Sequence, residues 1–282
     1  ISGRLAGRVG AIELNDCLYE QIDVDGRLVN KSFSGSVRSD CEPLRMIVTG
    51  VADMNTASPT YDFHLTVNDA DLHAMNLNKR DSVSRVAFNA DLYAVGRTID
   101  DMNGSVAIDG ARYYYNADTL RTGSVNLSAR SRSEQRSLSL TSDFADANFT
   151  SLTSYNDLVK YLKTAMCKYL PGLADDEQVL AINEDKGYSA LAIKVKDIDP
   201  LLDCITNGLE MAEGSKLEML ISPIENRFVM RASSEYLMHH NYLVTNIDVQ
   251  AGNAGDSLAV TLAAEDLYAG MFHLSGVGMN GG

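Results

Sequence analysis

Tryptophan is absent from the chain, and proline is scarce, with 5 residues in 282. No apolar run approaches the roughly 18 residues that a membrane-spanning helix needs, so the sequence holds no candidate transmembrane segment. A positive charge excess is lacking too: 24 Lys and Arg against 38 Asp and Glu give a net charge of −14. Because such a chain repels phosphate backbones, we expect no nucleic acid among its partners.

The short motifs that often mark catalysis are missing as well. The sequence contains no G-x-S-x-G, no P-loop and no HExxH. Two metal ligands on one strand need i, i+2 spacing to share a face, so the adjacent pair His239 and His240 does not indicate a metal site. We therefore expect no enzyme, no cofactor and no bound metal.

Cysteines are few and scattered. Cys17, Cys41, Cys167 and Cys204 form no CxxC pair, so a clustered zinc site is not expected. Cys17 and Cys41 lie in the first strand-rich stretch and could pair in an oxidising compartment, or all four thiols could be buried or unpaired. The sequence leaves both options open.

Period-two alternation of apolar and polar residues is abundant. In "YDFHLTV" (61–67) the aromatic and aliphatic residues alternate with Asp62, His64 and Thr66. Similar runs recur along the chain, separated by turn signals such as Asp25-Gly26 and Asn103-Gly104. The pattern predicts hairpin after hairpin of antiparallel strands, hence a mainly β fold.

Two helices are predicted among the strands. Apolar residues at helical spacing indicate an amphipathic helix over 154–169, begun by Ser154 and Asp157 and stopped by Pro171-Gly172. A short second helix is expected to start with Asp199 as its cap and Pro200 in its first turn, and to end near Asn207-Gly208. The remaining connections are predicted as short helical turns or loops.

Two sequence segments each occur a second time in degenerate form. "RSLSLTSDFADANFT" (136–150) matches "DSLAVTLAAEDLYAG" (256–270), and "VNDADLHAMNL" (67–77) matches "VKDIDPLLDCI" (195–205). We interpret them as degenerate copies of one strand-building unit. The predicted division is a tail of a preceding β repeat at 1–60, a β repeat at 61–150, the amphipathic helix at 151–173 and a second β repeat at 174–282.

Three longer stretches carry a family resemblance. They are "SVSRVAFNADLYAVGRTIDDMNGSVAID" (82–109), "RSLSLTSDFADANFTSLTSYNDLVKYLKTAMCKYLPGL" (136–173) and "IKVKDIDPLLDCITNGLEMAEGSKLEM" (193–219). With Phe88-Asn89, the step from Ile99 to Gly104 and the Ser142–Asp146 phrase, the chain resembles the TamB proteins of the AsmA-like family, Bacteroidetes type. It lacks that family's N-terminal membrane helix and closing C-terminal domain, so the resemblance implies an interior fragment.

The resemblance implies both a fold and a function. The family's fold is an elongated, curved antiparallel sheet, a taco-shaped β-groove. Its members are periplasmic proteins anchored in the inner membrane by the helix missing here, and they serve outer-membrane biogenesis. Phospholipid acyl chains are expected on the groove's apolar lining, and an outer-membrane barrel protein is a further possible partner in protein assembly.

The residues expected to line the groove are the apolar alternates on one side of the strands. They are Phe63, Leu65, Val67, Phe88, Leu92, Val106, Ile108, Val125, Leu127, Leu138, Leu140, Ile193, Val195, Met219, Ile221, Phe228, Met230, Leu258, Val260 and Leu262. Three alternatives stay open. The same side chains could form a dry protein core, the chain could be an adhesive or interacting β-sandwich of the cell envelope, or its strand edges could form a scaffold for assembling outer-membrane proteins.

Overall fold

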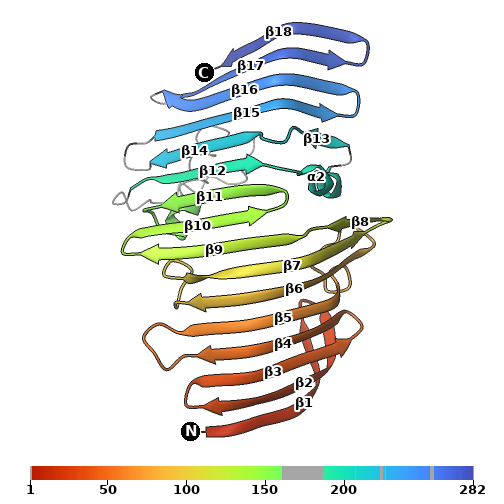
Figure 1. Cartoon of the computed structure of the whole chain (residues 1–282), viewed down its shortest axis with the longest axis vertical. Helices are drawn as coiled ribbons and strands as arrows, with labels where there is room; N and C mark the ends of the chain where they lie inside the picture. Colours follow the sequence, from red (N-terminus) through yellow and green to blue (C-terminus); the bar gives the residue numbers. More distant parts are fainter. Residues whose placement is uncertain are drawn as a thin grey trace. The chain divides into compact units, whose positions relative to one another are not determined.

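The computed structural model describes residues 2–160, 187–206, 208–222, 225, 227–254 and 257–281. Within them, 18 strands form one antiparallel sheet, accompanied by two short helical segments (Figure 1). The predicted mainly β, antiparallel class is confirmed. The chain divides into two compact units, Ile1–Ala129 (unit 1) and Arg130–Gly282 (unit 2).

Unit 1 is a ladder of hairpins in which each strand from β1 to β7 pairs antiparallel with the next along the chain, and β9 also pairs with β7. The first turn has Asn15 and Asp16 at φ of 55° and 58°, the left-handed conformation that a two-residue hairpin favours. The strands are β1 (Ser2–Leu14), β2 (Cys17–Val29), β3 (Ser32–Cys41), β4 (Leu44–Asp53), β5 (Thr60–Asp71), β6 (Ser84–Val95), β7 (Asn103–Tyr115), β8 (Asp118–Arg121) and β9 (Ser124–Arg132), the last of which runs past the end of unit 1.

Unit 2 continues the same architecture with one irregular step. After β12 the chain forms the helix α2 (Asp199–Ile205), and β12 pairs with β14 while β13 pairs with β15. The other strands pair with their neighbours in sequence. The strands are β10 (Gln135–Ser142), β11 (Ala145–Ser151), β12 (Ser189–Val195), β13 (Leu209–Met211), β14 (Lys216–Ser222), β15 (Arg227–His239), β16 (Tyr242–Ala254), β17 (Ser257–Ala269) and β18 (Phe272–Gly281).

The helix predicted after residue 154 begins as expected. Residues 155–160 are helical, and the backbone N–H of Asp157 donates to Ser154 Oγ at 3.1 Å. The Ser154 hydroxyl in turn donates to the Asp157 carboxylate at 2.8 Å. Ser154 is therefore the N-cap. The predicted continuation to residue 169, the stop at Pro171-Gly172 and Cys167 lie outside the described residues.

The predicted cap of α2 is wrong. Ile198 is the N-cap residue and makes no side-chain cap bond, while Asp199 lies in the first turn. The backbone N–H of Met211 donates to Asp199 Oδ1 at 2.9 Å. The carboxylate thus satisfies a donor on β13, the strand that follows the helix, rather than the helix's own N–H groups. Pro200 is in the first turn as predicted, and the helix ends at Ile205, slightly earlier than expected.

The described cysteines, Cys17, Cys41 and Cys204, form no disulfide, and the first and last of them are buried. A Cys17–Cys41 disulfide is therefore absent from this structure. No helix within the described residues has the length and apolarity to cross a membrane. The repeat boundaries predicted at 60, 150 and 173 stay predictions.

Candidate functional site

The candidate site is the apolar face that the strands of each unit form. In unit 1, β5 and β6 pair Phe63 with Leu92 and Val67 with Phe88. Directly opposite residues of antiparallel strands point to the same face, with Cβ atoms about 5 Å apart. Leu65 lies between them on the same face, because successive residues of a strand alternate sides.

The same face continues across β7 and β9. Leu92 lies opposite Val106, and Val106 lies opposite Leu127. One row further along the strands, Ile108 lies opposite Val125. All the predicted lining residues of unit 1 therefore share one face of the sheet.

The predicted lining residues of unit 2 also share one face. The register of β14 with β15 pairs Met219 with Met230 and Ile221 with Phe228, and that of β16 with β17 pairs Ala251 with Val260. Two further register rows complete the face: Leu138–Phe149–Leu191–Met219 and Leu140–Ala147–Ile193–Leu217. Val195, Leu258 and Leu262 occupy the same alternation, opposite Ala145, Asn253 and Val249.

Sequence reasoning missed part of this face. Val24, Val37 and Val48 form one row across β2, β3 and β4, on the side of Leu65. Phe149 and Leu191 belong to it in unit 2. Their alternation is visible in the sequence, but only the register shows that they extend the same rows.

The apolar faces are neither closed cores nor fully open surfaces. Of the predicted lining residues, Val67, Val195 and Ile221 are buried, and Leu127 is 41% exposed. The others are half-buried. In the interior of a sandwich, a second layer would bury nearly all of them.

In unit 2, protein side chains cover part of the apolar face. Leu158, in the first turns of the helix that begins at residue 155, is 8% exposed and forms a cluster with Ile221. Phe149, Met219 and Phe228 pack against this cluster. The rings of Phe149 and Tyr155 are 6.1 Å apart. The start of the helix therefore lies on the face that the predicted lining residues form, which agrees with the amphipathic pattern of its sequence.

In unit 1, a row of glycines interrupts the apolar face. Gly26 lies opposite Gly35, Gly35 opposite Gly50, and Gly50 opposite Phe63. A Cβ on Gly35 would stand 2.4 Å from both the Asp25 carbonyl oxygen and the Gly26 Cα. Only glycine fits there, because the neighbouring backbone approaches too closely for any side chain.

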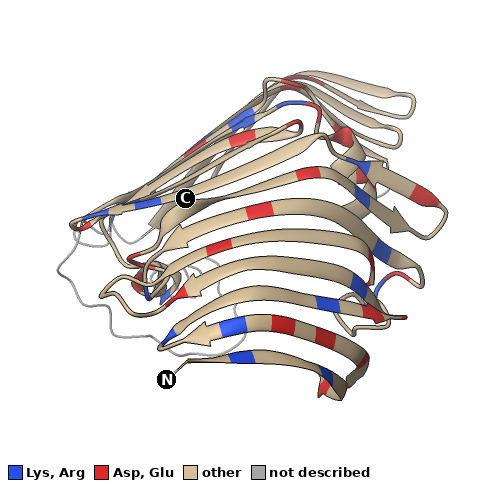
Figure 2. Ribbon diagram, turned by 60° about the horizontal axis from the view of Figure 1, so that its bottom comes forward, with Lys and Arg blue, Asp and Glu red and all other residues tan. Residues whose placement is uncertain are grey.

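Charged residues occur on many strands (Figure 2), and the register places paired ones of unit 1, Arg8 with Asp23 and His64 with Asp91, on the opposite face. Arg8 Nε donates to Asp23 at 2.8 Å, and His64 Nδ1 lies 2.6 Å from Asp91. The hydrogen bond from Arg8 holds the pKa of Asp23 below its ordinary value. In unit 1, paired ions therefore lie on the side of the sheet opposite the predicted lining residues, a side that also carries the exposed Val51 and Tyr93.

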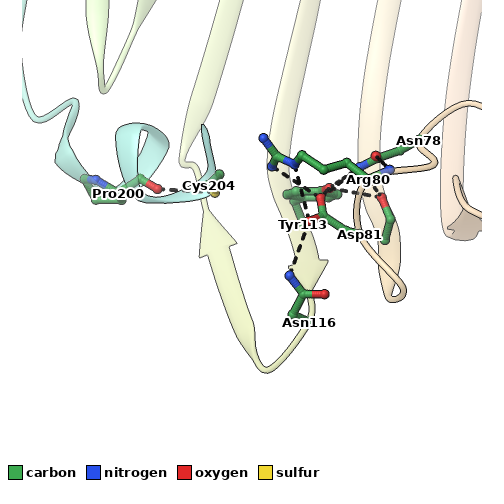
Figure 3. A network of polar contacts seen from close by, with 8 residues as sticks. Asn78, Arg80, Asp81, Tyr113, Asn116, Pro200 and Cys204 are labelled. Carbon is green, nitrogen blue, oxygen red and sulfur yellow. Dashed lines mark hydrogen bonds and ion pairs between the residues drawn. The ribbon is translucent and has the colours of Figure 1, made fainter. Parts of the chain in front are cut away.

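A polar network surrounds Asp81 in the connection between β5 and β6 (Figure 3). Asn78 Nδ2 and the Tyr113 hydroxyl donate to Asp81 Oδ2 at 3.0 and 3.3 Å, and Asn116 Nδ2 donates to Oδ1 at 3.2 Å. Hydrogen bonds from Asn78, and then from Arg80 and Asn116, lower the pKa of Asp81. A carboxylate so stabilised in its charged form is a poor proton donor, so its role is to tie this connection to the β7–β8 turn.

Asp266, His273 and Ser275 have the residue types of a hydrolase triad without its geometry. His273 Nε2 lies 2.7 Å from Asp266 Oδ1 and 3.2 Å from Ser275 Oγ, so one ring nitrogen faces both partners. A triad needs the acid and the nucleophile on different ring nitrogens. Hydrogen bonds from His273 and Ser275 keep the pKa of Asp266 low. These residues form a polar cross-strand cluster, and the prediction of no enzyme stays a prediction.

Two further sequence features show no site geometry. Residues 276–281 read G-x-G-x-x-G, but they lie inside β18 instead of at a strand-to-helix turn, where such a loop binds a dinucleotide. The rings of His239 and His240 are 4.3 Å apart at the end of β15. In the part of the chain that the structure describes, no group of His, Cys, Asp and Glu could hold a metal ion.

Comparison with known proteins finds no matching family model, no similar curated protein and no similar solved structure.

Proposed function

We propose that the chain is a β-groove segment of a TamB/AsmA-like protein. Its apolar face binds and conducts phospholipid acyl chains between the inner and outer membranes, in the periplasm, within a protein anchored in the inner membrane. The observation that carries the proposal is the register. In each unit the predicted lining residues all lie on one face, and most of them are only half-buried.

The chemistry of the face suits an acyl chain. Each buried CH₂ gains about 0.8 kcal/mol and needs no directional partner. A row of half-exposed aliphatic and aromatic side chains therefore supplies everything that an acyl chain requires. Since no residue of the face must change protonation or bond to the ligand, conduction along it needs no catalytic group.

The close approach at the glycine row supports a curved groove in unit 1. Gly26, Gly35 and Gly50 replace side chains on the apolar face, and their neighbours' backbones lie within contact of where a Cβ would be. Crowding on one face means that the sheet bends toward it, and glycine kinks and bulges are the usual devices for such bending. Register shifts between Val67 and Ala70 add to it. We infer that the apolar face is the concave one, and that the degenerate repeats of the sequence build successive parts of the groove.

A second candidate is the scaffold for outer-membrane protein assembly with a barrel partner, which would use exposed strand edges to pair with a strand of another protein. The sandwich alternative has less support, since all strands of the described residues belong to one sheet.

The first experiment asks whether lipid stays with the protein. The chain is purified under gentle conditions and extracted with organic solvent, and the extract is analysed by mass spectrometry beside a soluble control protein prepared identically. We expect near-stoichiometric phospholipid. Lipid at the level of the control protein would contradict the proposal.

Two double variants locate the binding face. Phe88→Asp with Leu140→Asp places charges on the lining and should abolish lipid retention. The matched control, Asn89→Asp with Ser139→Asp, alters the adjacent positions on the opposite face and should retain lipid. Circular dichroism checks the fold, because unfolding of the lining variant alone would show that the face is a dry core and would overturn the groove.

A further inference from the structure

Two hairpin turns of unit 2 lie side by side at one end of its strands (Figure 1). They are the β15–β16 turn at His240 and Asn241 and the β17–β18 turn at Gly270 and Met271. The pairing of β16 with β17 places Tyr242 opposite Ala269. The backbone N–H of Gly270 donates to the Asn241 carbonyl at 3.1 Å. We call these two turns with their flanking residues the tip pair.

Large apolar side chains project from the tip pair into solvent. Met271 is 100% exposed, Phe272 is 77% exposed and Tyr242 is 59% exposed. Ile205, at the end of α2, is also exposed. The backbone N–H of His240 donates to the Gly208 carbonyl at 3.3 Å, which brings the segment after α2 to the same end. Exposed apolar groups gathered at one end of the strands are typical of an interaction surface.

The tip pair also lacks Asp, Glu, Lys and Arg. No Asp, Glu, Lys or Arg occurs from Tyr236 to Ile247 or from Leu267 to Gly281. Every other connection between consecutive strands has a charged residue in the turn or directly beside it, such as Asp16, Lys31 and Glu42. Figure 2 shows where charges occur along the ribbons. In a chain with a net charge of −14, two neighbouring turns without these residues need an explanation that solubility does not supply.

The shape and the chemistry of the tip pair point to one kind of partner. A small molecule needs a concave site, whereas these turns are the protruding ends of hairpins. Methionine and phenylalanine enter the acyl boundary of a bilayer favourably, and tyrosine and histidine, with an apolar body and a polar tip, suit the headgroup level. The absence of lysine and arginine removes the attraction that anionic lipid would need.

We propose that the tip pair docks on the surface of a zwitterionic phospholipid bilayer, with Met271 and Phe272 inserted and Tyr242 at the headgroups. This contact is separate from the membrane anchoring that the family resemblance implies, and it does not depend on the apolar face of either unit. It gives the chain a membrane contact of its own.

Flotation with phosphatidylcholine vesicles tests the proposal. The wild-type chain should float with the vesicles, and Met271→Ser with Phe272→Ser should lower the partition coefficient about tenfold or more, since two large apolar groups no longer insert. The control variant, Leu77→Ser with Ile99→Ser, removes two other exposed apolar side chains, 63% and 71% exposed, in connections that carry charged residues. It should float like the wild type.

Three results would overturn the proposal: a wild-type chain that stays with the soluble fraction, a tip variant that floats undiminished, or equal losses in the tip and control variants. Vesicles containing phosphatidylglycerol should bind no better than phosphatidylcholine alone, and a clear increase would refute the zwitterionic preference. Lipid retention measured on the same tip variant separates the two proposals. It should be unchanged, since the acyl-chain face is untouched.

Discussion

The apolar faces of unit 1 and unit 2 both arise from alternating apolar and polar residues along the strands. They differ in what packs on them and in the size of the side chains that form them. In unit 2, Leu158 lies on the face and contributes to a buried cluster with Ile221. In unit 1, the described residues include no helix. There, a contact between distant loops is made instead: Asn15 Nδ2 in the β1–β2 turn donates to the Met75 carbonyl in the β5–β6 connection at 3.0 Å. Alternation therefore determines which side of a sheet is apolar without determining what covers it.

The side chains that form the two faces also differ in size. A row of unit 1 passes through Gly26, Gly35 and Gly50, whereas the row through Leu191, Met219 and Met230 in unit 2 is built of large side chains. The rings of Phe33 and Phe63 lie over Gly26 and Gly50, 2.5 and 2.6 Å from where a Cβ would stand, whereas the bulky row of unit 2 gives the helix side chains to pack on. In the proposed groove, unit 2 is therefore the segment that a helix fills.

The largest expected effect comes from adding a side chain to the glycine row of unit 1. Gly35→Ala places a Cβ against the backbone of β2, which cannot move without breaking the ladder, and we expect a loss of about 3 kcal/mol or more in the free energy of unfolding. Gly7→Ala on β1 is the control, because no atom lies within 4 Å of its Cβ position. Urea denaturation followed by circular dichroism measures both. Equal stability of the two variants would mean that the glycine row has no special role.

A smaller effect is expected from uncovering the face of unit 2. Leu158→Ala should cost about 2–4 kcal/mol, because it removes the side chain that packs with Ile221. It should also increase the binding of an environment-sensitive apolar dye. Val159→Ala, at a half-exposed neighbouring position, should change stability by no more than about 0.5 kcal/mol. If both variants behave alike in urea and with the dye, the helix does not cover the face in solution.

The smallest effect concerns pH and is specific to unit 1. Because the folded state lowers the pKa of Asp81, the charged carboxylate stabilises the fold above the ordinary pKa of about 3.9, and this contribution is lost as the pH falls through the lowered value. Wild type should therefore be more stable than Asp81→Asn at pH 7, and the difference should shrink as the pH falls below about 4. A difference that stays constant from pH 7 to 3 would contradict this assignment.

Much of the fold followed from local patterns. The alternation at 61–67 predicted β5, and Ser154 with Asp157 predicted the start of the first helix. The error at Asp199 has a different origin. An Asp before Pro-Leu-Leu has the sequence of a helix cap, but Met211, twelve residues later, supplies the donor that its carboxylate accepts. No local pattern shows that partner, because β13 is brought there by its pairing with β15.

The candidate site shows the same division. By itself the sequence determined that the chain is mainly β and which side chains share a face, because alternation of sides is a covalent property of an extended backbone. The tertiary structure decided three things: that Gly26, Gly35 and Gly50 form one row, that Leu158 covers Ile221, and that the turns near His240 and Met271 are neighbours. Each depends on strand register or on packing between distant segments, and both are set by the energy of the whole assembled sheet.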